Sequence, residues 1–234
     1  SWINKLNTNE YSSDRVQRWY DIGPFASASP NPSGSLPTII TSEFDQAIPK
    51  RTFGVTRSSS AGTQQLITNN NTSIPGKQSL TVYIVTNFAT TNGADQNITI
   101  LNSRNGNTAN RFVLKTSNVV GSEGRLELIR YFNSGSASVI GDDNYRTDQW
   151  EIIKLELYTN GIAIRNGLTK NDNVYNFTYN KSTSISNTNL MYVTPFLMNF
   201  ATGYSIGEVM VYDGIISSTD DQKILKYLAD KYQP

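Results

Sequence analysis

Short alternating runs of apolar and polar residues follow one another along the chain from residue 51 onward. The clearest runs are 51–57, 64–68, 80–88, 97–103, 110–116, 125–132, 149–159, 161–167, 174–180 and 205–214. A period of two places successive side chains on opposite faces of an extended backbone, so each run predicts a β-strand. Short strands separated by polar turns at this rhythm are typical of an antiparallel sandwich or barrel.

Asn-Gly pairs occur between or near the ends of these runs. They include Asn105-Gly106, Asn160-Gly161 and Asn166-Gly167. Both residue types tolerate positive φ angles, which the tightest hairpin turns require. We therefore predict tight hairpins at the last two pairs.

Residues 1–50 carry most of the proline punctuation, at positions 24, 30, 32, 37 and 49. Proline cannot donate a hydrogen bond to a central strand ladder, so the stretch 25–37 is predicted to be a loop or an extended segment along a sheet edge. No shift in composition marks a second domain. Residues 1–234 are thus predicted to form one domain, with 1–50 as its Pro/Gly-rich opening segment.

The end of the chain predicts one amphipathic helix over residues 217–232. Its apolar side chains recur at helical spacing and share one face: Ile224, Leu225, Leu228 and Tyr232. A helix with such a face buries it against another layer of the protein. We expect this helix to pack on the sandwich.

The start of this helix offers several hydroxyl N-caps, Ser217, Ser218 and Thr219. Thr219 with Gln222 three residues later fits a capping box, and Ser218 with Asp221 fits a looser one. The negative charge of Asp221 is also favourable near the N-terminal, positive end of the helix dipole. The pattern leaves all three residues open as the cap.

The composition excludes several classes of function. The chain has 234 residues with no His and no Cys, so thiolate sites, histidine bases, Ser–His triads and His-ligated metals are excluded. Its 20 basic and 19 acidic residues give a net charge of +1 and form no basic stripe for nucleic acid. No apolar run is long enough to span a bilayer. Partners are therefore expected to exclude nucleic acid, and membrane insertion is not expected.

Three stretches resemble the laminin-G-like, concanavalin A-like family of jelly-roll domains. The longest is IGEVMVYDGIISSTDDQKILKYLADKYQ (206–233), which is similar to the family's closing strand and Ser-capped helix. RVQRWYDIGPF (15–25) and QWEIIKLELYTNGIAIRNG (149–167) are similar to its opening Trp-Asp motif and to an interior hairpin. The resemblance implies an all-β fold, a two-sheet antiparallel jelly-roll sandwich with one C-terminal α-helix.

Glycoside hydrolases related to this family carry their catalytic carboxylates on one strand, in patterns such as E-x-D-x-x-E. The nearest stretch here is EIIKLE, where Ile153 stands in place of the aspartate. Strand alternation also separates its ends, with Glu151 on the face of Ile153 and Glu156 on the face of Lys154. We therefore predict no catalytic site and ordinary strand roles for both glutamates.

Two further acidic residues recur in the closing signature, Glu208 and Asp213. Alternation again places them on opposite faces of one strand, and neither has a second carboxylate at useful spacing. Roles as hydrogen-bond partners for the backbone or the helix are predicted for both.

Asp142, Asp143 and Asn144, followed by Tyr145, form the best cluster of oxygen donors in the chain. Calcium requires six to eight oxygen ligands, and many laminin-G-like domains hold it at a loop rim, so Asp142 and Asp143 are the calcium candidates. Carbohydrate sites combine planar amides and carboxylates with an aromatic platform, so the four residues are also the candidate ligand loop. The alternative is an ordinary polar turn without a ligand.

The resemblance and the composition together favour a non-catalytic binding or surface-display module. We expect a partner that is a glycan or a protein surface. The preferred setting is a virion, as a phage decoration, fibre or receptor-binding protein among other virion proteins, with a location outside the cell or on the virion surface. The alternative is a carbohydrate-binding module of a bacterial adhesin or secreted enzyme, with a glycoside hydrolase ranked lower. Homo-oligomer formation stays open, and no cofactor other than calcium is considered.

Overall fold

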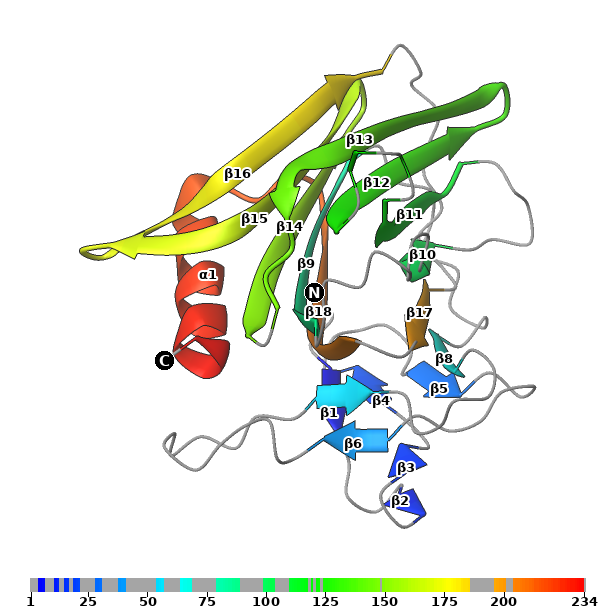
Figure 1. The fold of residues 1–234 in the computed structure, drawn as a ribbon, viewed down its shortest axis with the longest axis vertical. Coiled ribbons are helices and arrows are strands. Elements are labelled where there is room, and N and C mark those ends of the chain that lie inside the picture. The colour runs from blue at the N-terminus through cyan, green and yellow to red at the C-terminus, as the bar shows by residue number, and fades with distance from the viewer. Residues whose placement is uncertain are drawn as a thin grey trace.

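The computed structural model describes residues 79–88, 99–103, 110–117, 119, 121–122, 124–147, 149–185 and 205–233, together with the backbone of several shorter strands. The strands form two sheets in which every pairing of neighbouring strands is antiparallel, as far as the described residues show. Helix α1 (Ser218–Tyr232) follows the last strand. Figure 1 shows this helix beside β14, β15 and β16, on the opposite side of them from β10, β11 and β12.

The first sheet has nine strands. In spatial order they are β1 (Asn4–Leu6), β4 (Trp19–Asp21), β5 (Ala28–Pro30), β8 (Gln64–Thr68), β17 (Phe196–Phe200), β10 (Thr99–Ser103), β11 (Phe112–Thr116), β12 (Arg125–Phe132) and β13 (Gly135–Asn144). Strand β13 therefore lies at one end of this sheet.

The second sheet also has nine strands. Their order is β16 (Val174–Ser184), β15 (Gly161–Asn171), β14 (Trp150–Tyr158), β9 (Leu80–Phe88), β18 (Tyr204–Asp213), β7 (Gly54–Thr56), β6 (Thr38–Ile40), β3 (Arg15–Val16) and β2 (Tyr11–Ser12). Strand β16 lies at one end of this sheet. Strand β9 pairs with β14 on one side and with β18 on the other.

The hydrophobic core lies between the two sheets. Strand β14 shows how the alternating pattern builds it, because Ile153, Leu155 and Leu157 face this interior and are fully buried. The alternate residues Trp150 and Ile152 face the other way and pack in a second cluster beneath helix α1. The central strands of this sheet are thus buried on both faces, which explains their nearly continuous apolar character.

The apolar face of helix α1 covers that second cluster. Its buried residues are Leu225, Leu228, Ala229 and Tyr232, whereas Ile224 of the predicted face is only partly buried. The strand beneath must approach closely, because a Cβ atom on Gly207 would lie 2.7 Å from the Tyr232 ring and 3.0 Å from the Trp150 ring. A glycine at this position of β18 is therefore a packing requirement of the helix.

The helix is capped by the first of the three candidate residues. Ser217 is the N-cap, with extended φ and ψ, and its Oγ accepts a hydrogen bond from Asp220 N at 3.2 Å. The Thr219 capping box is wrong because the Gln222 side chain is used elsewhere. Its Oε1 accepts from the backbone N of Tyr175 and its Nε2 donates to the carbonyl of the same residue, both at 2.8 Å. The predicted span of 217–232 otherwise matches the cap and helix together.

Most strands predicted from residue 51 onward are confirmed, but β13 and β17 were missed, and the short strands of residues 1–50 were not predicted as strands. Strand β13 begins with small and polar residues and ends in Gly-Asp-Asp-Asn, all with low intrinsic strand preference. Pairing along the whole length of β12 determines its structure instead. Within the segment 25–37, strand β5 lies between β4 and β8 and not along a sheet edge as predicted. Pro30 is its last residue. The rest of 25–37 falls outside the described residues.

The two predicted hairpins have different outcomes. Strands β14 and β15 are joined by the tight turn Thr159-Asn160, with Tyr158 opposite Gly161, close to the predicted position. The Asn166-Gly167 pair is not a turn, because it lies within β15. Gly167 has a φ of +69° and separates Ile164, which faces the interior, from Leu168, which packs beneath the helix. The glycine reverses the alternation of the strand without ending it.

Of the opening motif 15–25, strands β3 and β4 are described, and the rest lies outside the described residues. The division of the chain into a single domain over 1–234 stays a prediction.

Candidate functional site

The predicted ligand residues lie at the end of strand β13, not in a loop. Arg125 of β12 is opposite Asn144, whereas Glu127 is opposite Ile140, so the register shifts between these pairs. The shift leaves extra residues of β13 bulging out of the ladder. Bulges at a sheet edge redirect side chains away from the ordinary strand faces. Here the bulge turns the two aspartates toward the neighbouring sheet.

Both aspartates contact side chains of β16, the end strand of the second sheet. Asp142 Oδ1 lies 2.8 Å from the Lys181 ammonium. Asp143 accepts a hydrogen bond from the Tyr179 hydroxyl and another from the Asn144 backbone N. Tyr179 and Lys181 are two residues apart on one strand, so the contacts join the ends of the two sheets. We call these four side chains, Asp142, Asp143, Tyr179 and Lys181, the rim cluster.

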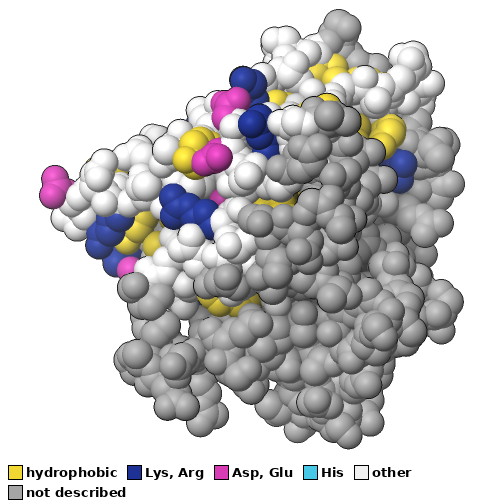
Figure 2. Space-filling view, in the orientation of Figure 1, with side chains coloured by type: hydrophobic (Ala, Val, Ile, Leu, Met, Phe, Trp, Pro, Cys, Tyr) yellow, Lys and Arg dark blue, Asp and Glu magenta, His cyan; other side chains and the backbone are white. Residues whose placement is uncertain are grey.

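The rim cluster is accessible to solvent and nearly balanced in charge. The Asp142 and Lys181 side chains are 47% and 50% exposed. The hydrogen bond from Tyr179 lowers the pKa of the Asp143 carboxyl, and the nearby cations Arg125 and Arg146 act in the same direction. Figure 2 shows acidic and basic side chains close together on an otherwise uncharged surface in this part of the molecule.

Tyr145 does not belong to this surface, which corrects the sequence-based expectation. Its ring is 5% exposed and stacks on Phe88 in the interior, with centroids 4.0 Å apart. The alternation of the chain beyond the bulge turns the tyrosine inward, where burial of a large ring is favourable. Asn144 stays exposed, and its side chain lies over Gly124. The aromatic group nearest to the aspartates is instead Tyr179, which the strand pattern alone did not single out.

The calcium assignment to Asp142 and Asp143 stays a prediction. Within the described residues no group of three or more acidic side chains comes together in a way that suits a metal ion. Each aspartate already has a partner from β16, and calcium needs six to eight oxygen ligands. A metal here would have to displace Lys181 and recruit further oxygens.

Glu151 lies behind the rim cluster and is 1% exposed. Its Oε2 accepts from the backbone N of Arg146 at 3.1 Å. Its Oε1 accepts from Asn166 Nδ2 at 3.0 Å and from Gly167 N at 3.4 Å. Burial raises the pKa of the Glu151 carboxyl, and the hydrogen bonds from these groups only partly oppose that effect. The glutamate connects the chain just after the rim cluster to strand β15.

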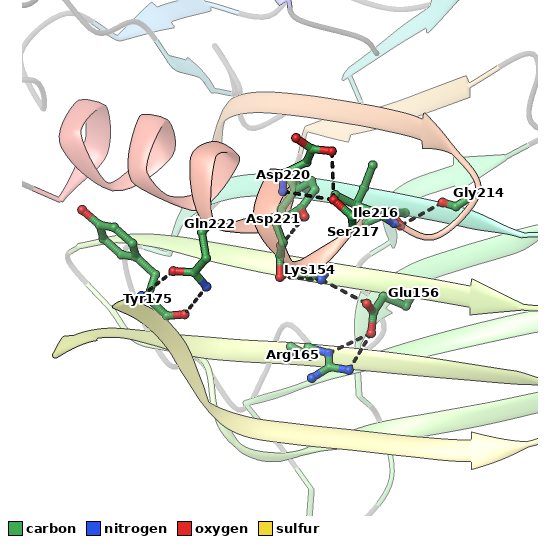
Figure 3. A network of polar contacts seen from close by, with 12 residues as sticks. Lys154, Glu156, Arg165, Tyr175, Gly214, Ile216, Ser217, Asp220, Asp221 and Gln222 are labelled. Atoms are coloured by element: carbon green, nitrogen blue, oxygen red, sulfur yellow. Dashed lines mark hydrogen bonds and ion pairs between the residues drawn. The ribbon is translucent and has the colours of Figure 1, made fainter. Parts of the chain in front are cut away.

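Glu156 faces the helix, as alternation predicts, and belongs to a separate network (Figure 3). The Lys154 ammonium lies 3.0 Å from Glu156 and 2.9 Å from Asp221 of helix α1. Arg165 lies 2.7 Å from the other oxygen of Glu156. The Tyr83 hydroxyl also donates to Asp221. Glu151 and Glu156 thus lie on opposite faces of β14, and they do not form a catalytic pair.

Glu208 has a structural role in the same interface. Its carboxylate accepts hydrogen bonds from Lys231 at 2.7 Å, from Tyr232 at 3.2 Å and from Tyr227 at 3.2 Å. All three donors are on helix α1. The predicted role as a hydrogen-bond partner is confirmed, with side chains of the helix as the partners.

Solved structures with a similar fold cover almost the whole chain. The binding domain of botulinum neurotoxin DC in complex with rat synaptotagmin II matches 97% of this chain with a TM-score of 0.64 and 9% identity. The same toxin's binding domain in complex with SialylT matches 97% with a TM-score of 0.60 and 9% identity. The binding domain of Paraclostridial Mosquitocidal Protein 1 matches 97% with a TM-score of 0.63 and 10% identity. This chain spans about half the length of each of them, 51%, 51% and 52%.

These matches establish the fold. The chain has the concanavalin A-like, laminin-G-like jelly-roll fold, with two antiparallel sheets and a C-terminal helix, as the resemblance implies. No family model matches the chain. No curated protein matches it either. Its neighbours in structure are β-sandwich binding domains. Among the described residues, none of the helical segments is long and apolar enough to cross a membrane.

Proposed function

We propose that this chain is a non-catalytic binding module and that the rim cluster is part of its contact surface. The observation that carries the proposal is the division of its acidic groups. Glu151, Glu156 and Glu208 are buried and engaged by partners within the protein, whereas Asp142 lies in a half-exposed ion pair at the junction of the two sheets. The exposed groups are suited to recognition, and the buried ones stabilise the fold.

A glycan is the favoured partner. Sugar hydroxyls are recognised by carboxylates, amides and cationic groups beside an aromatic ring. Asp142, Lys181, Asn144 and Tyr179 supply these groups on one surface. Structures of a neighbour with the same fold have been solved in complex with SialylT and with rat synaptotagmin II, which supports a glycan partner and keeps a protein partner as the alternative.

The setting is proposed to be extracellular, or the surface of a virion such as a phage, where the module would act in decoration, in a fibre or in receptor binding. A bacterial adhesin or a secreted enzyme that carries a carbohydrate-binding module is the alternative setting. In either case residues 1–234 would act as one domain, either alone or as a homo-oligomer.

A glycan array with the purified chain tests the proposal. We expect saturable binding that is weakened at least about ten-fold in Lys181→Ala, because a charge-assisted hydrogen bond contributes about 1.5–3 kcal/mol. Lys226→Ala is the matched control, since Lys226 also forms an exposed ion pair, 2.7 Å from Asp230, but on the helix. Equal loss in both variants, or binding that Lys181→Ala leaves unchanged, would contradict the assignment to the rim cluster. Measurable turnover of a β-glucan would contradict a non-catalytic role.

The protein alternative has its own readout. A virion or assembly component predicts no affinity for free glycans together with attachment to a capsid or tail protein. Light scattering coupled to size-exclusion chromatography would give the mass of the particle formed and distinguish a self-associating module from a monomer.

A further inference from the structure

The Glu151 carboxylate is unusual because its hydrogen-bond partners within the described part of the chain are all neutral N–H groups. The donors are the backbone N of Arg146, the backbone N of Gly167 and the Asn166 amide. A buried carboxylate is normally paired with a cation, because desolvation of an isolated charge is expensive. By contrast, Glu156 on the same strand is bound by Lys154 and Arg165.

The three donors come from two segments that lie on either side of the rim cluster. Arg146 lies two residues beyond the end of β13, directly after the rim cluster. Asn166 and Gly167 lie at the point where β15 reverses its alternation, and the Gly167 Cα lies close to the Tyr179 ring, since a Cβ there would be 2.6 Å from it. Glu151 therefore connects the segment just after β13 to the β15–β16 hairpin. It accepts a hydrogen bond from Arg146 N in the first and from Gly167 N in the second.

The ionisation state of the carboxylate decides how many of these bonds can form. A carboxylate accepts at both oxygens, whereas a protonated carboxyl carries one O–H that itself needs an acceptor. The two backbone N–H groups cannot act as acceptors, and the Asn166 side chain would have to turn over to offer its Oδ1. Protonation therefore replaces one accepted hydrogen bond with an O–H that faces a donor.

The other groups that face Glu151 do not change this conclusion. Among the described residues, the Arg146 guanidinium favours the charged form of Glu151. The pKa of the Tyr179 hydroxyl is raised mainly by its hydrogen bond to Asp143, and the Glu151 charge adds least to that shift. Burial raises the pKa of Glu151 above its ordinary value.

We infer that Glu151 is an acid-sensitive latch that positions the rim cluster: as a carboxylate it fixes Arg146 and Gly167 against each other, and on protonation it releases them. That the latch controls partner binding rests on the proposed function. The latch itself concerns only the geometry of the β13 end and the β15–β16 hairpin.

Nuclear magnetic resonance of the ¹⁵N-labelled chain tests the latch without a ligand. We expect the amide resonances of Arg146 and Gly167 and the side-chain amide of Asn166 to titrate together, with one midpoint above 4.5, the ordinary value for glutamate. Below the midpoint, the Arg146 amide should exchange with solvent about ten-fold faster relative to its intrinsic rate, which is the effect of one lost hydrogen bond. Glu151→Gln should abolish the shared titration.

Glu156→Gln is the matched control, because it removes the other buried carboxylate of β14 and leaves the Glu151 contacts in place. If Glu151→Gln does not fold, ¹³C detection of the Glu151 carboxyl in the unmodified chain gives the same answer, since its midpoint must coincide with that of the amides. Amides that do not titrate together, or that keep their titration in Glu151→Gln, would overturn the latch.

The array distinguishes this inference from the proposed function. With any glycan that binds at pH 7.5, affinity should fall below the midpoint in the unmodified chain and in Glu156→Gln, and stay level in Glu151→Gln. An array without binding at any pH would count against the proposed function, and the amide titration would then decide the latch separately.

Discussion

The Lys231 ammonium of helix α1 lies 2.7 Å from a Glu208 carboxylate whose side chain is 0% exposed. Burial alone lowers the pKa of Lys231, but the charge of Glu208 and the hydrogen bonds to it raise that pKa overall. Tyr227 and Tyr232 donate to the same carboxylate, so one acidic side chain of β18 organises the last turns of the helix. The helix is therefore attached to the sheet by a specific polar contact as well as by its apolar face.

Replacing Glu208 should destabilise the protein strongly. Glu208→Ala leaves Lys231 without its partner at a largely buried position and removes an acceptor from two tyrosines. Breaking a buried ion pair in this way costs about 3–5 kcal/mol. Urea unfolding followed by circular dichroism measures the change. Asp230→Ala, which breaks the exposed pair with Lys226, is the control and should change the stability by no more than about 0.5 kcal/mol. A similar small effect in both variants would contradict the role given to Glu208.

Gly207→Ala should loosen the helix by steric conflict. The added methyl group would meet the Tyr232 ring at 2.7 Å and the Trp150 ring at 3.0 Å, both of which are buried. Overpacking of this kind costs about 1–3 kcal/mol. Gly141→Ala is a suitable control, because its nearest contact would be an ordinary 3.6 Å. Thermal unfolding should show a lower midpoint for Gly207→Ala than for Gly141→Ala, and equal midpoints would refute the packing argument.

The stability supplied by Glu156 should depend on pH. Burial raises the pKa of its carboxyl, but the Lys154 charge and the hydrogen bonds from Tyr158 and Lys154 outweigh burial, so the folded-state pKa lies below the ordinary 4.5. The unfolded chain then binds more protons than the folded one just below pH 4.5, and the contribution is lost as pH falls through the folded-state pKa. The difference in unfolding free energy between the unmodified chain and Glu156→Gln should stay constant from pH 7 to pH 5.5. It should shrink below pH 4.5, and a difference that grows on acidification would contradict the sign.

Local sequence was sufficient for much of the fold. The ladder of β9 and β14 follows from two long, mostly apolar runs, and the helix over Ser218–Tyr232 follows from its periodicity. Alternation also separated Glu151 from Glu156 correctly. Where an element is long and its pattern strong, the local preference and the tertiary environment agree.

The misses share a physical cause. Strand β13 is built from residues that favour turns, and only its pairing with β12 makes it a strand. Gly167 is a good turn residue that serves instead to reverse the alternation of β15. The Thr219 capping box does not form, because the Gln222 side chain is hydrogen-bonded to the backbone of Tyr175 on β16. A contact so distant in sequence is not part of any local motif.

The candidate site shows the same division more sharply. Asp142 and Asp143 were found from composition, but Tyr179 and Lys181, which complete the rim cluster, come from a strand more than thirty residues away. The end strands of two different sheets must meet before these side chains can touch. Tyr145, adjacent in sequence, was turned into the core by the same packing.

The sequence by itself determined the class of fold, the central strands, the closing helix and the absence of histidine and cysteine chemistry, because periodicity and composition are local properties. The tertiary structure alone decided which polar groups are buried and which face solvent. Glu151, Glu156 and Glu208 look alike along the chain, yet each was assigned its partners by strands and a helix that are distant in sequence. Burial and pairing of a charge depend on everything packed around it, and no local pattern encodes that environment.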